Sequence, residues 1–151
     1  AVAVDEGIRL ADAPESVSLD GVADYAVCKP MTLGGAAATL RVAESIGVPV
    51  VISGSLDTGV GLSTSIAAAA ALEDLPLASG LGTGTLLATD LTDPPLRPRD
   101  GLLPARRMAP DLQALVQASD AIDPDRAAWW RKRLRSAYAT ISQTADREVE
   151  G

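Results

Sequence analysis

Histidine is absent from the 151-residue chain, and cysteine occurs only once. The missing imidazole removes the commonest metal ligand and general base, so any metal is expected to be a hard ion bound by oxygen. A single cysteine excludes an internal disulfide and suits a reducing cytoplasm. No apolar run approaches the ~20 residues of a membrane span, no signal peptide is visible, and the net charge of −7 argues against a nucleic-acid surface. We therefore predict a cytoplasmic protein without a membrane or nucleic-acid partner.

Short apolar segments recur along the first half of the chain at near-constant spacing, and each ends in a polar or small residue. The four terminal residues are Asp5, Lys29, Ser53 and Gly80. Alanine-rich segments lie between them, which is the pattern of βα units with parallel strands and helical crossovers. The carboxyl ends of parallel strands meet at one edge of a sheet, where barrels and open α/β folds carry their chemistry. These four positions therefore define a candidate site.

The predicted fold class is α/β, with about four βα units that amount to half of a (β/α) barrel. A complete barrel needs about 250 residues, and the chain opens inside its first strand at Ala1, so we expect the C-terminal part of a longer protein. The last strand is predicted at Leu77–Ser79. Prolines between residues 90 and 104 predict an extended surface segment, and helices are expected at residues 109–118 and 124–142. The predicted domains are residues 1–104, the barrel part, and residues 105–151, a helical extension.

Lys29 is one of two lysines in the chain, and it closes an apolar strand. Alternation along the strand places Lys29 on one face and Cys28 on the other, so Cys28 is expected to be a small buried hydrophobe rather than a nucleophile. A strand-end charge is costly unless it is paired or functional, and the alternative is a side chain that extends into water. For Asp5 the alternatives are a metal ligand and a solvated strand-end acid. Asp57 is expected to cap its own loop rather than to act in catalysis.

Four sequence blocks carry a resemblance to a known family. They are Val-Ala-Val-Asp-Glu at residues 2–6, Cys-Lys-Pro at 28–30, Val-Ile-Ser-Gly-Ser-Leu-Asp-Thr-Gly-Val-Gly at 51–61 and Ser-Gly-Leu-Gly-Thr at 79–83. Together they resemble the last four strands of an enolase-superfamily barrel, and within that superfamily the o-succinylbenzoate synthases of the actinobacterial kind. The resemblance covers residues 1 to about 104, and the tail from residue 109 carries little of it.

The resemblance implies a metal site and a positive charge beside the substrate. Members of the superfamily bind one Mg²⁺ through three carboxylates at successive strand ends, and the third of these matches Asp5. Two lysines flank the substrate, and the later one, which stabilises the enediolate anion, matches Lys29. An anionic intermediate of this kind needs a divalent ion and a positive side chain, so the chemistry supports both assignments.

The resemblance also implies a site for the remote carboxylate of the substrate. In the family the succinyl tail is held by backbone and hydroxyl groups that match Ser53 and Gly80. With their neighbours these residues make up the predicted substrate-binding set, Ser53, Gly54, Gly80 and Leu81. Free backbone N–H groups in the turn of residues 80–84 would form an anion nest there. The predicted ligand is therefore a small-molecule carboxylate.

The predicted function is the Mg²⁺-dependent syn-dehydration of 2-succinyl-6-hydroxy-2,4-cyclohexadiene-1-carboxylate to o-succinylbenzoate, a lyase reaction of menaquinone biosynthesis. In the family the proton-abstracting lysine and two metal carboxylates lie upstream of the matched strands, so the active site is incomplete in this chain alone. The expected partner is the missing N-terminal half of the enzyme, in the same or a separate chain. The alternatives are N-acylamino acid racemisation, dipeptide epimerisation, muconate cycloisomerisation, or a non-catalytic half-barrel that serves in assembly.

Overall fold

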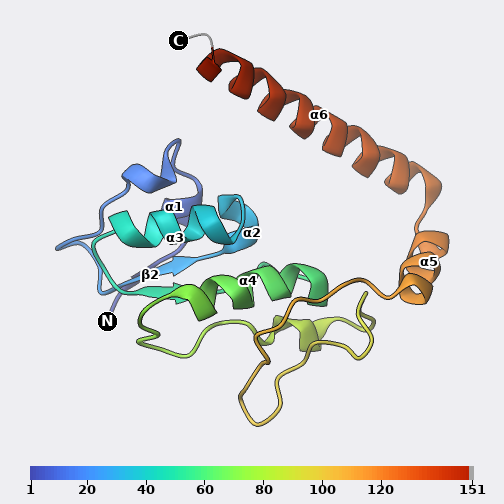
Figure 1. Ribbon diagram of the computed structural model, residues 1–151, viewed down its shortest axis with the longest axis horizontal. Helices are drawn as coiled ribbons and strands as arrows, with labels where there is room; N and C mark the ends of the chain where they lie inside the picture. Colours follow the sequence, from blue (N-terminus) through green and yellow to red (C-terminus); the bar gives the residue numbers. More distant parts are fainter. Residues whose placement is uncertain (150–151) are drawn as a thin grey trace. The chain divides into compact units, whose positions relative to one another are not determined.

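The computed structural model describes the backbone of residues 1–149 and the side chains of residues 1–141. The chain divides into two compact units, Ala1–Ala114 and Leu115–Gly151. The first unit holds a sheet with its helices, and the second is helical (Figure 1). The candidate site lies wholly within the first unit. The domain boundary near residue 104 stays a prediction.

Three parallel strands form the sheet of the first unit. They are β1 (Ala3–Val4), β2 (Tyr25–Cys28) and β3 (Val50–Ile52), in the spatial order β1-β2-β3. A helical connection follows each strand, as parallel pairing requires. The α/β class and the parallel arrangement of these strands are thereby confirmed.

The fourth predicted strand, at Leu77–Ser79, is not formed. Its remnant is a single parallel bridge between Ser53 and Gly80 beside β3. Pro76 lacks a backbone donor and Leu77 is 48% exposed, so the segment gains neither a hydrogen-bonded ladder nor burial on both faces. The bridge nevertheless fixes position 80 next to the end of β3.

Four α-helices connect and cover the strands. α1 (Glu6–Arg9) and α2 (Pro30–Leu33) are single turns, whereas α3 (Ala36–Ser45) and α4 (Gly59–Ala71) occupy the alanine-rich segments that follow β2 and β3. The proline that opens α2 suits a first helical turn, and the φ of 93° at Gly34 is the left-handed conformation that favours glycine at a helix end. Apolar periodicity does not predict the two single turns, because one turn is too short to show it. Two short 3₁₀ turns lie at Pro14–Ser16 and Gly82–Leu86.

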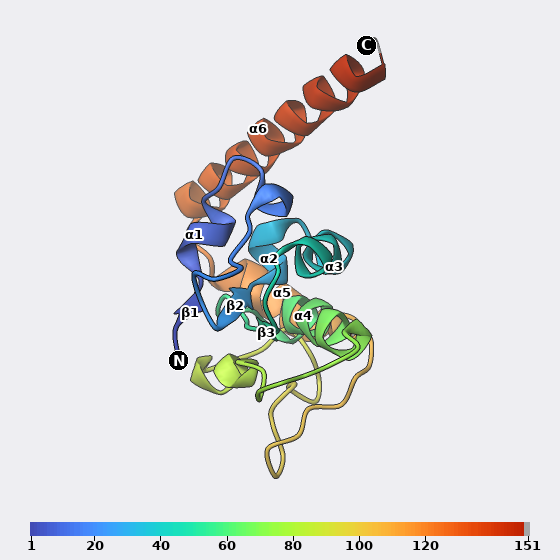
Figure 2. The same cartoon turned by 90° about the vertical axis from the view of Figure 1, so that its left-hand side faces the viewer.

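The pairing register assigns alternate strand residues to opposite faces of the sheet. Helices α3 and α4 lie on the same side of the strands (Figure 2). Cys28 pairs with Ile52, and both are fully buried in the core on this covered face. The other face carries a partly exposed row of side chains that ends in Lys29 and Ser53. The largest buried side chains of the unit include Ile8, Val42, Ile46, Ile52, Leu62 and Leu96.

One carboxylate anchors the proline-rich segment that follows the sheet. Asp90 accepts hydrogen bonds from the backbone N–H of Gly59 at the start of α4 (2.8 Å), of Leu91 (2.7 Å) and of Leu96 (3.4 Å). It also accepts one from the hydroxyl of Thr92 (3.0 Å). Burial alone would raise the pKa of Asp90, but these donors outweigh it and lower that pKa. The segment is therefore fixed to α4 rather than simply extended.

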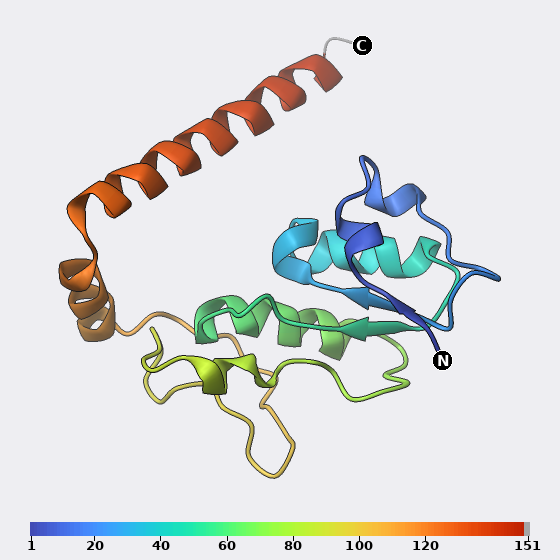
Figure 3. The same ribbon diagram turned by 180° about the vertical axis from the view of Figure 1, so that it is seen from behind.

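Two helices follow the proline-rich segment. α5 (Leu112–Ala121) begins in the last residues of the first unit and continues into the second, and α6 (Pro124–Val149) belongs to the second unit. Figure 3 shows α6 as one continuous helix. α5 starts later than expected because Asp111 caps it, accepting the N–H of Ala114 at 2.8 Å. α6 runs past residue 142, where the sequence pattern places its end. No helix within residues 1–149 is long and apolar enough to cross a membrane.

Candidate active site

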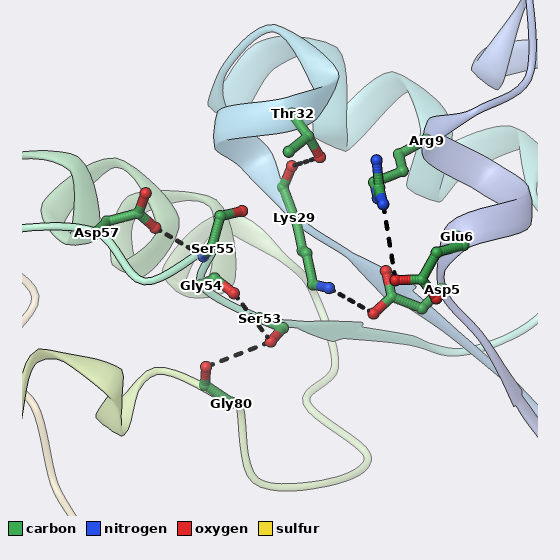
Figure 4. A network of polar contacts seen from close by, with 10 residues as sticks. All are labelled: Asp5, Glu6, Arg9, Lys29, Thr32, Ser53, Gly54, Ser55, Asp57 and Gly80. Atoms are coloured by element: carbon green, nitrogen blue, oxygen red, sulfur yellow. Dashed lines mark hydrogen bonds and ion pairs between the residues drawn. The ribbon is translucent and has the colours of Figure 1, made fainter. Parts of the chain in front are cut away.

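The carboxyl ends of the strands bring the four predicted positions to one edge of the sheet. Asp5 follows β1, Lys29 follows β2, and Ser53 follows β3 and pairs with Gly80. Figure 4 shows Asp5 and Lys29 directed toward each other, with Ser53 beside Gly80. Four segments that are distant in sequence thus contribute to one cluster, as the spacing of the strands predicts.

An ion pair joins the two charged members of this cluster. Nζ of Lys29 lies 2.5 Å from Oδ2 of Asp5, and the two side chains are only 21% and 26% exposed. The ammonium group is therefore held against a carboxylate and does not extend into water. Oδ1 of Asp5 accepts no hydrogen bond from the side chains and backbone that the structure describes. Oδ1 of Asp5 and the partly buried ammonium group of Lys29 thus lie together at the edge of the sheet.

The backbone of both residues is used to start a helix, which leaves their side chains available. Asp5 and Lys29 are the N-cap residues of α1 and α2, and neither side chain caps its own helix. The carbonyl of Lys29 accepts the N–H and the hydroxyl of Thr32, each at 2.9 Å. The side chains of Asp5 and Lys29 are therefore positioned by the ends of β1 and β2, not by capping bonds to the helices that follow.

Cys28 lies next to the ion pair but on the buried face. It has no exposed surface, and burial together with the nearby Asp5 carboxylate raises the pKa of its thiol to about 11. A thiol with so high a pKa is almost entirely protonated at neutral pH. The structure confirms that Cys28 is a small core residue.

The backbone around Ser53 and Gly80 is already hydrogen-bonded. The N–H of Gly80 donates to the carbonyl of Ile52 (2.8 Å), that of Gly54 to the carbonyl of Gly80 (3.0 Å) and that of Leu81 to the carbonyl of Ser79 (3.0 Å). The anion nest predicted for this turn therefore has no free donor at positions 80 and 81, because the bridge to β3 uses the N–H of Gly80 and a tight turn uses the N–H of Leu81. The Ser53 hydroxyl donates more weakly, to the carbonyls of both Gly54 and Gly80 at 3.4 Å.

Close packing explains the glycines at this edge. A Cβ atom at Gly80 would lie 2.8 Å from Oγ of Ser53, and one at Gly54 would lie 3.2 Å from Oγ1 of Thr83. That Thr83 hydroxyl is buried and has no partner among the described residues. Sequence reasoning missed Thr83, although it ends the Gly-Leu-Gly-Thr block. Gly54, Gly80 and Leu81 thus lie at the predicted edge, where they contribute backbone rather than side chains.

The loop after β3 is held by its own acidic residue. Asp57 accepts the backbone N–H of Ser55 at 2.9 Å, so its predicted role in capping this loop is confirmed. Between them Leu56 adopts a φ of 65°, which is uncommon for a leucine, and its side chain is 54% exposed. The loop therefore keeps a fixed shape beside Ser53.

The metal-ligating groups of this edge are few. Asp5 contributes one carboxylate, while the carboxylate of neighbouring Glu6 is exposed and lies 3.8 Å from the guanidinium group of Arg9. Within the described part of the chain, no group of three or more acidic, cysteine or histidine side chains could hold an ion. These residues alone do not make a complete Mg²⁺ site, although Asp5 fits the part of one ligand.

Known proteins match almost the whole chain. The o-succinylbenzoate synthase of Mycobacterium ulcerans is 46% identical over 140 residues, that of Thermobifida fusca 45% over 142 residues, and that of Mycobacterium leprae 43% over 143 residues. The chain is related to o-succinylbenzoate synthases. The resemblance drawn from the strand-end blocks is confirmed, and it extends well beyond residue 104 into the helical tail. No family model matches the chain.

The length of these relatives bears on the site. The three matches cover 93–94% of this chain but only 41–43% of each relative. The chain thus spans less than half the length of the synthases that it matches. A site that holds one carboxylate and one lysine is what part of a larger catalytic domain would supply.

Proposed function

We propose that the chain forms the C-terminal part of an o-succinylbenzoate synthase and supplies one side of its active site. The supporting observation is the identity of 43–46% to such synthases over almost the whole chain, together with the convergence of Asp5, Lys29, Ser53 and Gly80 on one sheet edge. The fold of the complete domain would be an enolase-superfamily (β/α) barrel, of which residues 1–104 form about half. The reaction would be a lyase step of menaquinone biosynthesis in the cytoplasm.

In the proposed reaction, the substrate 2-succinyl-6-hydroxy-2,4-cyclohexadiene-1-carboxylate loses water. The C1–H and C6–O bonds break, a ring double bond forms, and the product ring is aromatic. Removal of the C1 proton leaves negative charge on the adjacent carboxylate. The Lys29 ammonium group stabilises this charge, and its partial burial makes the interaction stronger than it would be in water.

Asp5 would provide one oxygen ligand to Mg²⁺. When bound, the ion would neutralise the substrate carboxylate and so make the C1 proton more acidic. Because no group of three or more ligating side chains gathers among the described residues, the remaining ligands would come from outside them, and so would the proton-abstracting base. The partner in this proposal is therefore a polypeptide that corresponds to the part of the related synthases outside the matched region.

The remote succinyl carboxylate would bind beside the bridge between β3 and Gly80. The Ser53 hydroxyl is the donor most easily released there, because its hydrogen bonds to the carbonyls of Gly54 and Gly80 are long, at 3.4 Å, whereas the N–H groups of Gly54, Gly80 and Leu81 bond at 2.8–3.0 Å. These three residues would shape the site by close backbone packing. A hydrogen bond from the N–H of Gly54 or Gly80 to substrate would require the bridge to open, and one from Leu81 would require its bond to the Ser79 carbonyl to break.

The test is to reconstitute activity from two parts. The chain is mixed with the complementary N-terminal part of the Thermobifida fusca synthase, and dehydration is followed by the absorbance of the aromatic product. We expect Mg²⁺-dependent turnover from the mixture and none from the N-terminal part alone. N-acylamino acid and dipeptide substrates serve as comparisons, because racemisation or epimerisation would identify a different activity of the superfamily. A stable complex without turnover of any of these substrates would contradict the proposed function.

A further inference from the structure

The first half of α6 is strongly basic, although the chain as a whole is acidic. Between residues 126 and 142 there are five basic side chains and no acidic one, in a chain of net charge −7. The basic residues are Arg126, Arg131, Lys132, Arg133 and Arg135. All are exposed. The proposed enzymatic function makes no use of this segment.

An exposed apolar stripe runs along the same part of the helix. Trp130, Leu134 and Ile141 are spaced as neighbours on one helical face, and their exposed fractions are 48%, 71% and 67%. The spacing places Arg126 and Arg133 along one side of this stripe, with Arg131 and Arg135 along the other. Lys132 falls on the opposite face.

Cation–π contacts order the aromatic end of the stripe. The guanidinium group of Arg126 lies 5.4 Å from the ring centre of Trp129 and 5.9 Å from that of Trp130, and Arg133 lies 5.6 Å from Trp129. The two indole rings meet edge to face at 4.7 Å. Cationic groups are therefore held at the border of the apolar surface, with their charge still facing water.

The charge pattern decides between possible occupants of this stripe. A second copy of α6 would bring flanking arginines against arginines in either a parallel or an antiparallel pair, and like charges at these positions are destabilising. An anionic lipid surface has no such conflict, because its headgroups are mobile and surround the helix. Its apolar layer accepts the stripe while arginines extend to the phosphates.

We propose that residues 126–141 of α6 form an interfacial helix that binds the surface of a bilayer containing anionic phospholipids. Trp130, Leu134 and Ile141 enter the headgroup boundary, and the flanking arginines contact lipid phosphates. The prediction that the protein has no membrane partner considered only segments that span a bilayer. Surface binding depends instead on an apolar stripe with basic flanks.

The tryptophans provide a direct test, because Trp129 and Trp130 are the only two in the chain. The full chain is titrated with vesicles of phosphatidylcholine alone or mixed with phosphatidylglycerol, and tryptophan emission and co-sedimentation are measured. We expect a blue shift and sedimentation with phosphatidylglycerol only, both reversed by high salt. Trp129→Phe should keep most of the shift and Trp130→Phe should lose most of it, since residue 130 lies in the stripe.

A matched pair of charge reversals separates the proposed face from overall charge. Arg131→Glu flanks the stripe and Lys132→Glu lies opposite to it, yet both change the net charge equally. We expect Arg131→Glu to weaken vesicle binding at least about fivefold and Lys132→Glu to weaken it less. Far-UV circular dichroism checks that both variants keep the helix. If they do not, the salt and lipid dependence of vesicle binding by the unmodified chain still tests the proposal.

Four outcomes would overturn the proposal. They are no response to phosphatidylglycerol vesicles at low salt, equal binding to both vesicle types, equal losses from the two charge reversals, and an equal emission shift with polyglutamate at matched charge. An equal shift with polyglutamate would indicate that this face of α6 binds an acidic protein surface instead of lipid.

Discussion

At the scale of single residues, the position of Lys29 leads to a direct kinetic prediction. In the reconstituted enzyme, Lys29→Ala should lower kcat by about 10²–10³ or more, because one preorganised charge-stabilising group is lost. Lys29→Arg should fail as well, since a planar guanidinium group does not replace a compact ammonium. Steady-state kinetics provide the measurement. Lys132→Ala, at the only other lysine of the chain, is the matched control and should keep normal turnover.

The contact between Gly80 and Ser53 predicts an effect on substrate binding. Gly80→Ala places a methyl group 2.8 Å from Oγ of Ser53, so the serine must move. We expect KM to rise and the free energy of unfolding to fall by about 1–3 kcal/mol. Gly82→Ala is the control, because its added Cβ would meet only Pro98 at an ordinary 3.7 Å. Equal effects of the two variants would show that the Ser53 contact is unimportant.

The thiol of Cys28 predicts a chemical reactivity. Because its pKa is about 11 and it has no exposed surface, iodoacetamide should leave it unmodified near neutral pH in the folded chain. The same reagent should label it fully in denaturant, where the pKa returns to that of a free thiol. Mass spectrometry gives the extent of labelling. Rapid labelling without denaturant would mean that the sheet opens readily beside Asp5.

At the scale of elements, Asp90 predicts a pH-dependent attachment of the proline-rich segment to α4. The folded state lowers the pKa of Asp90 below its usual 3.8, so the stabilisation is complete above about pH 4 and is lost as pH falls through the folded pKa. Asp90→Asn should reduce the free energy of unfolding at neutral pH by about 1–2 kcal/mol. Denaturant titrations of both proteins should show this difference shrinking below about pH 4.

A neighbouring acid provides the control for that experiment. Asp93 lies in the same segment and is exposed, so Asp93→Asn should leave the unfolding free energy unchanged across the same pH range. A stability difference for Asp90→Asn that persists undiminished at pH 2 would contradict the carboxylate mechanism. It would point instead to packing around Leu96 and Thr92.

The elements also show how far the sequence determines this fold. Strands β2 and β3 follow from short apolar segments because their alternate residues are buried under helices, and β1 follows as the apolar segment that pairs with β2. The strand ends follow with them. The segment Leu77–Ser79 looks similar in sequence, but an exposed face and a preceding proline leave only the bridge at Gly80. The sequence could not show that the N–H groups of Gly54 and Gly80 are engaged, because the bridge that uses them joins segments far apart in the chain. The attachment of Asp90 to Gly59 escapes sequence patterns for the same reason.

At the scale of the whole molecule, the chain is expected to be inactive by itself. Purified chain with saturating Mg²⁺ should show no dehydration of the cyclohexadiene substrate, because one carboxylate holds this ion too weakly and the proposed function takes its proton-abstracting base from outside the chain. The measurement is turnover at high protein concentration, with the reconstituted mixture as the positive control. A clear rate from the chain alone would show that the catalytic residues have been misassigned.

The ion pair between Asp5 and Lys29 makes the binding of oppositely charged ligands interdependent. A cation that binds Asp5 competes with Lys29 for the carboxylate, and an anion that binds Lys29 competes with Asp5 for the ammonium. Each ligand thus removes a competitor of the other, and by thermodynamic linkage the gain in affinity is the same in both directions. The edge of the sheet is therefore suited to take up a cation and a carboxylate together, with cooperativity that arises from the charge already balanced within the protein.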